Sequence, residues 1–114
     1  MATIRAFTTI EQSRKLAEIL PIESADMYWW SSGKRYYVEA MDDGDFNEEG
    51  DIRAWSLAAL LNALPNGIVM NKDSQNGRYH FSSTHAGTYV IADNPIDACV
   101  SMIEKLNELK LLRL

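Results

Sequence analysis

The side chains best suited to catalysis and metal binding are scarce in this chain of 114 residues. It contains two histidines, His80 and His85, and one cysteine, Cys99. A cysteine beside a histidine could act as a nucleophile, and the three together could hold zinc. The histidines, however, lack the H-x-x-x-H spacing that presents two ligands together, and Cys99 falls on an apolar helical stripe, where buried and unreactive thiols are common. We therefore predict structural or surface roles for all three, with Cys99 buried.

An acidic segment at residues 42–51 has part of the spacing of a calcium-binding EF-hand loop. The residues that match its first, third, fifth and sixth positions are Asp45, Asn47, Glu49 and Gly50. The twelfth position, which supplies a bidentate glutamate in such loops, is Ser56. Because that ligand contributes much of the affinity, we predict a solvated loop that does not bind calcium tightly, and no metal site or cofactor.

A group of aromatic and basic residues is the third candidate. Such residues can stack on bases or form a contact surface for a protein partner. Alternation along a strand sends neighbouring aromatic side chains to opposite faces, so one set must leave the core unless helices cover both faces of the sheet. The alternatives are a sheet packed on both sides and an exposed aromatic interface. The possible interaction surface consists of Tyr28, Trp29, Trp30, Lys34, Arg35, Tyr36 and Tyr37.

No glycine-rich phosphate loop, nucleophile elbow or paired-carboxylate motif occurs in the chain, so we predict no catalytic residues and no enzyme. The first functional hypothesis is a non-enzymatic accessory or interaction protein that binds a protein partner or associates with itself. A second is an acidic protein that inhibits a host factor by surface mimicry. A third is a small-molecule or nucleotide binder that uses the aromatic residues with Lys34, Arg35 and Arg78.

Length, charge and cysteine content limit the number of domains, the partners and the cellular compartment that we expect. A chain of this length fits a single domain, here residues 1–114, with a core that needs no disulfide. The net charge of −5 argues against a dedicated nucleic-acid binder, which needs a basic surface. The chain has one cysteine, no apolar run long enough to span a membrane and no signal-peptide pattern. We therefore predict a soluble cytoplasmic protein without a membrane partner.

Three helices are expected to carry these residues. The first begins at Thr8 or Thr9, each of which has the partner of a capping box three residues further on. It ends near Pro21, because proline does not fit a helix interior. The second covers residues 52–64, an almost wholly apolar stretch.

The third helix has the clearest signals. Asn94 is a good N-cap, Pro95 suits the first helical position, and Asp97 lies favourably in the first turn. One apolar stripe at helical spacing follows and predicts the core-facing side, namely Ile96, Cys99, Val100, Ile103 and Leu106.

Strands fill the intervening segments. Residues 26–31 and 35–41 form one predicted hairpin, and residues 67–72 and 78–83 form another around Asn76-Gly77. Residues 88–92 are either a further strand or a continuation of the fourth. The fold class is therefore α+β with the order αββαββα, in which three helices pack on an antiparallel sheet of about four strands. The two helix–hairpin units are similar either because the unit is doubled or by chance.

Two phrases resemble a known group of proteins. They are residues 51–65, DIRAWSLAALLNALP, and residues 92–100, ADNPIDACV, which lead into Met102 and Ile103. With residues 11–13 and 24–29, they are similar to uncharacterised small proteins of phages, prophages and gut bacteria, in particular to the phage ABA sandwich domain. The resemblance covers residues 8–112 and implies an accessory protein of a phage or mobile element in the cytoplasm of a bacterial host. It implies no activity and no functional residues.

Overall fold

Two antiparallel sheets and three helices make up the computed structural model, which describes residues 6–41, 46–84 and 87–112. The first sheet has the strand order β2-β1-β3, with β1 at Met27–Ser32, β2 at Arg35–Ala40 and β3 at Ile52–Ala54. The second has the order β4-β5-β6, with β4 at Ile68–Lys72, β5 at Tyr79–Ser83 and β6 at Tyr89–Ala92. The α+β class is confirmed.

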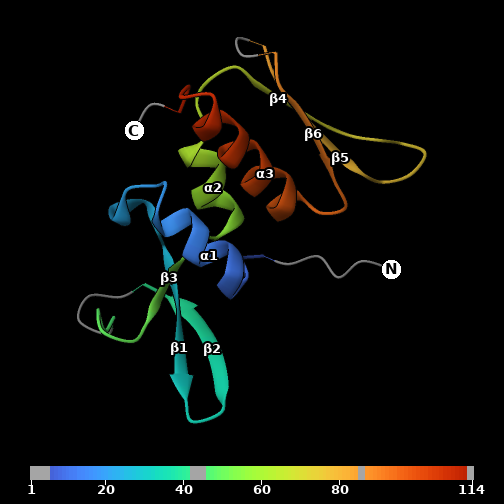
Figure 1. Cartoon of the computed structure of the whole chain (residues 1–114). Coiled ribbons are helices and arrows are strands. Elements are labelled where there is room, and N and C mark those ends of the chain that lie inside the picture. Colours follow the sequence, from blue (N-terminus) through green and yellow to red (C-terminus); the bar gives the residue numbers. More distant parts are fainter. Residues whose placement is uncertain (1–5, 42–45, 85–86, 113–114) are drawn as a thin grey trace.

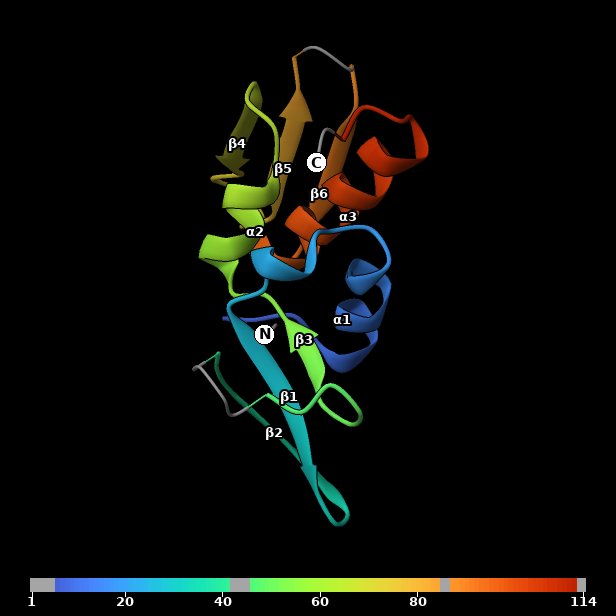
Figure 2. The same cartoon turned by 90° about the vertical axis from the view of Figure 1, so that its left-hand side faces the viewer.

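The helices lie between the two sheets (Figure 1, Figure 2). They are α1 at Ile10–Ala17, α2 at Leu57–Ala63 and α3 at Pro95–Glu108, with a short 3-10 turn at Ile22–Ser24. The first sheet extends from one end of this helical layer, and the second sheet covers the other end.

The expected single sheet of about four strands is not confirmed. Each predicted hairpin forms, but each recruits a third strand of its own, since β3 pairs with β1 and β6 pairs with β5. Both hairpins thus keep one strand in the centre of a separate sheet, and the helices separate them. Residues 89–92 are a further strand rather than a continuation of the fourth.

The prediction of where the second helix starts is wrong. Residues 52–54 form β3, in which Ile52 lies opposite Trp29 of β1. The helix begins only after Ser56, whose hydroxyl accepts a hydrogen bond from the backbone of Ala59. Pairing with a distant strand therefore overrides the apolar helical pattern, and the N-cap Ser56 places the helix start at Leu57, five residues later than predicted.

The ends of the other two helices follow their local signals. Thr9 caps α1 through a complete capping box with Gln12, one of the two predicted boxes, although the helix ends at Ala17, before Pro21. Asn94 caps α3 by accepting a hydrogen bond from the backbone of Asp97, and Pro95 occupies the first turn. These predictions are confirmed because caps depend on residues adjacent in sequence.

The main core forms around α3. All five residues of its predicted stripe are buried, Cys99 included. Trp55 is fully buried beside them, and its indole Nε1 donates to Ser24 Oγ at 3.0 Å. Burial raises the pKa of the Cys99 thiol to about 12. Within the part of the chain that is described, no helix is long and apolar enough to cross a membrane.

Candidate functional site

The β1–β2 hairpin projects beyond the helical layer (Figure 1, Figure 2). A tight turn joins its strands, and Gly33 in that turn adopts a φ of 67°, a left-handed conformation that favours glycine. The register places Trp30 opposite Tyr37 and Ser31 opposite Tyr36. All seven predicted surface residues therefore lie on one element, but they divide between its two faces.

One face is anchored to the body through Trp29. Its indole Nε1 donates to the backbone oxygen of Thr8 at 3.1 Å, and its ring meets Phe7 edge to face at 5.6 Å. Tyr36 lies on this same face, two residue pairs nearer the turn, and is 45% exposed. The base of this face is therefore covered, whereas its outer end is open.

On the other face, too, the side chains are buried at the base of the hairpin and exposed toward the turn. Tyr28 is buried at the base, where its ring meets Phe46 edge to face at 5.8 Å and its hydroxyl donates to Glu39. The Arg53 guanidinium lies 4.4 Å from the centroid of the Phe46 ring and pairs with Glu48 at 2.7 Å. This packing fixes the hairpin at the point where it leaves the body.

Nearer the turn, this second face exposes a stacked pair. The rings of Trp30 and Tyr37 are 4.8 Å apart and nearly parallel, and Tyr37 is 43% exposed. The Trp30 indole Nε1 is buried and has no hydrogen-bond partner among the described residues. Lys34 and Arg35 are exposed beside the pair, and no described carboxylate forms an ion pair with either. The outer hairpin thus presents aromatic rings and two positive charges.

The outer face of the second sheet holds a polar group that the sequence did not reveal. His80 Nδ1 is hydrogen-bonded to the Tyr89 hydroxyl, and His80 Nε2 lies 3.6 Å from an oxygen of Asp73. With Asn71 and Ser82 these residues line a shallow depression of about 240 Å³. Alternation along β5 places His80 on the face opposite Tyr79 and Phe81. The neighbours of His80 depend on the register of β5 with β6, which local sequence does not specify.

The cysteine–histidine pair that the sequence argued against does not form between Cys99 and His80. Cys99 lies on α3, which packs against the inner face of the second sheet, whereas His80 lies on the outer face. His85 is outside the described residues. Among those that are described, no three histidine, cysteine or acidic side chains are grouped so that they could hold a metal ion.

No protein-family model, curated protein or solved structure matches this chain. The resemblance to the phage ABA sandwich domain therefore stays a hypothesis, and the functional argument rests on the geometry alone.

The acidic segment is described only from residue 46 onward, so Asp45 lies outside the described residues. In the described part, Asn47 Oδ1 accepts a hydrogen bond from the backbone of Glu49, and an Asp51 oxygen accepts one from the backbone of Asn47. These carboxylate and amide oxygens close a turn locally. The expected lack of tight calcium binding stays a prediction.

Proposed function

We propose that this protein is a non-enzymatic interaction module that binds an acidic surface of a protein partner through the outer half of the β1–β2 hairpin. The observation that carries the proposal is the exposure of Tyr36 and Tyr37 on opposite faces of one projecting element, with Lys34 and Arg35 next to them at the turn. Such a tip can enter a groove and contact both of its walls.

The chemistry of the tip supports a protein partner. Tryptophan, tyrosine and arginine are the residues most enriched among binding hot spots. Strand pairing and the stacked Trp30–Tyr37 rings hold the surface in one conformation, so little conformational entropy is lost on binding. The hydroxyls of the exposed Tyr36 and Tyr37 offer hydrogen bonds to the partner's carboxylates or carbonyls.

The charge distribution supports an acidic partner. The chain as a whole carries a net charge of −5, while the hairpin tip carries two cations without an ion-pair partner among the described residues. An acidic partner is repelled by the body and attracted by the tip, which orients the encounter. Salt should therefore weaken the attraction between the tip cations and the partner's carboxylates.

The test combines capture with matched variants. The wild-type protein is used to recover partners from bacterial lysate, and the recovered protein is then purified and its affinity measured directly. Tyr36→Ala and Tyr37→Ala should each weaken binding at least tenfold, because hot-spot truncations typically cost 2 kcal/mol or more, about thirtyfold. Tyr89→Ala removes a tyrosine of comparable exposure, 52%, from the second sheet and should leave the affinity unchanged.

Equal weakening by Tyr36→Ala and Tyr89→Ala in folded protein would contradict the proposal. Self-association is the other form of the same hypothesis, and sedimentation of the wild type and the Tyr37→Ala variant decides it. If the hairpin joins two copies, only the wild type sediments as a dimer. The suggested origin in a phage or mobile element rests on the sequence resemblance alone.

A second candidate is an inhibitor that mimics an acidic ligand. The feature that favours it is a depression between α1 and α3 in which three carboxylates, those of Glu18, Glu104 and Glu108, outnumber the one cation, Lys15. Glu104→Lys with Glu108→Lys should abolish binding to the target in that case, whereas the hairpin variants should not.

A further inference from the structure

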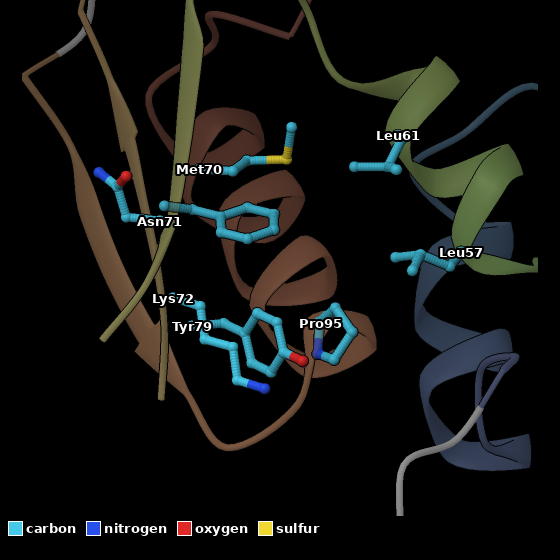
Figure 3. Close-up of a pocket in the computed structure, with 8 residues that line it drawn as sticks. Leu57, Leu61, Met70, Asn71, Lys72, Tyr79 and Pro95 are labelled. Carbon is cyan, nitrogen blue, oxygen red and sulfur yellow. The ribbon is translucent and has the colours of Figure 1, made fainter. Parts of the chain in front are cut away.

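An apolar pocket of about 280 Å³ opens between α2 and the inner face of the second sheet (Figure 3). These elements lie away from the hairpin tip (Figure 2). Leu57 and Leu61 of α2 form one wall, and Met70 of β4 with Tyr79 and Phe81 of β5 forms the other. In Figure 3 the side chains of Leu61 and Met70 point toward one another across the gap. The pocket is concave and mostly apolar, as small-molecule sites usually are.

The fold leaves this gap because α2 is short. It has seven residues and packs mainly against α3, so it does not extend over the edge strand β4. As a result Met70 is 51% exposed although it lies on the helix-facing side of its sheet, and Leu61 is exposed as well. Apolar side chains that face each other across an open gap gain free energy when an apolar group fills it.

One end of the pocket is positively charged. Lys72 lies there with its ammonium nitrogen 5.4 Å from the centroid of the Tyr79 ring. No carboxylate among the described residues forms an ion pair with Lys72. The Tyr79 hydroxyl points into the same region (Figure 3). An ammonium and a phenol at the edge of an apolar pocket complement a carboxylate joined to an apolar body.

We propose that this pocket binds a small amphipathic carboxylate, with its aliphatic or aromatic part between α2 and β4–β5 and its carboxylate at Lys72 and Tyr79. The pocket volume suits a molecule of this size better than a helix or strand of a protein partner, which requires a longer groove. The inference is independent of the proposed hairpin interaction, because the two surfaces share no residue.

The test is a titration with butanoate, hexanoate and octanoate, followed by amide chemical shifts in NMR spectra of the full chain. Affinity should rise by up to about fourfold for each added methylene, since burying one contributes about 0.8 kcal/mol. The shift changes should centre on Leu61, Met70 and Phe81. Octanol, which has no charge, should bind at least fivefold more weakly than octanoate.

Two matched pairs of variants make the result specific. Met70→Glu places a negative charge in the pocket and should abolish octanoate binding. Val69→Glu makes the same change at the next residue, which is 44% exposed on the opposite face, and should leave binding unchanged. Lys72→Gln should remove the preference for octanoate over octanol, whereas Lys34→Gln at the hairpin should preserve it.

Three outcomes overturn the proposal. The first is the absence of saturable binding by any carboxylate in the series. The second is equal weakening by Met70→Glu and Val69→Glu, which indicates non-specific adsorption. The third is octanol binding as tightly as octanoate to the wild type. None of these outcomes bears on the hairpin, whose variants are tested separately.

Discussion

The two sheets are built from similar hairpins, but the helices pack against them differently. In the second sheet α3 packs against β5 and β6, whereas in the first sheet α1 packs against β3, outside the β1–β2 hairpin. Ile68, Phe81 and Val90 of the second sheet belong to the main core or pack against it. Strands β1 and β2, which are described throughout, contribute no residue to either group. The first hairpin instead depends on a few contacts at its base, around Thr8 and Phe46. Helical cover thus decides whether a hairpin stabilises the fold or projects from it, and aromatic content does not.

The largest expected difference between the two sheets is in the stability lost when one aromatic residue of each is replaced by alanine. Phe81→Ala should lower the free energy of unfolding by about 3–5 kcal/mol, because it leaves a cavity in the core. Tyr37→Ala should cost about 0.5–1.5 kcal/mol, the value of a stacked aromatic pair. Urea denaturation of both variants measures the difference. Similar losses would show that the two sheets are equally important for stability.

Thiol labelling offers a second comparison. The pKa of Cys99 is raised from 9.0 to about 12, so at a pH below both values the thiolate population is about a thousandfold smaller than for an ordinary thiol. Native Cys99 should therefore react much more slowly than an exposed cysteine introduced by Ser31→Cys on β1 in a Cys99→Ala background, because burial both lowers its thiolate population and blocks access to the sulfur. Stopped-flow labelling with a disulfide reagent measures both rates. Rapid labelling of native Cys99 would contradict its burial.

Thr8 is the point at which the two regions meet. Its hydroxyl accepts a hydrogen bond from the backbone of Trp55 at 3.1 Å, and its carbonyl accepts the bond from Trp29. Thr8→Val leaves the buried Trp55 N–H without this partner and should cost about 1–3 kcal/mol. Thr84→Val removes an exposed hydroxyl and should change stability by at most about 0.5 kcal/mol. Thermal denaturation compares them, and equal changes would mean that Thr8 does not join the two regions.

The turn between β4 and β5 contains an aspartate, Asp73, that should make stability depend on pH. Backbone hydrogen bonds from Gln75, with a further one from Asn76 and the nearby His80, hold the pKa of Asp73 below its usual 3.8. A carboxylate whose pKa is lowered by folding stabilises the folded state at pH values above its usual pKa. This stabilisation is lost as the pH falls through the pKa of the folded state. Asp73→Ala should therefore be less stable than wild type at neutral pH and approach it in acid. Urea midpoints across this range test the expectation, and a difference that does not vary with pH contradicts it.

The smallest expected effect is a null result at the acidic segment beside the first sheet. Millimolar calcium should not raise the melting temperature, because the position of the bidentate ligand is Ser56, which instead caps α2. Magnesium at equal ionic strength is the control. A rise of several degrees with calcium alone would indicate a site in this segment.

Local signals predicted much of the fold. The caps of α1 and α3, the core stripe of α3 and the two hairpins involve residues close in sequence, whose preferences can be recognised directly. Residues 52–54 were mistaken for helix because their pairing partner, β1, lies more than twenty residues away. The division into two sheets escaped prediction for the same reason, since it depends on which distant strand joins each hairpin.

The candidate sites show the same limit. Alternation correctly placed Tyr36 and Tyr37 on opposite faces, but it could not show that contacts from Phe7 and Phe46 would cover only the base of the hairpin. The group of Asp73, His80 and Tyr89 and the pocket beside α2 both require strand register and helix placement. Sequence identified the residues that could bind, and only the tertiary arrangement identified those that remain accessible.

The absence of β1 and β2 residues from the main core also determines how these strands exchange their amide protons. Protein segments open locally with free energies that range from near zero to that of global unfolding, depending on how much buried structure each opening breaks. Opening the hairpin beyond Trp30 breaks strand hydrogen bonds and one aromatic stack, whereas opening β5 exposes Phe81 and disrupts the core. The amides of Ser31 and Tyr37 should therefore exchange through local openings while the core remains closed, and more rapidly than the amides of β5.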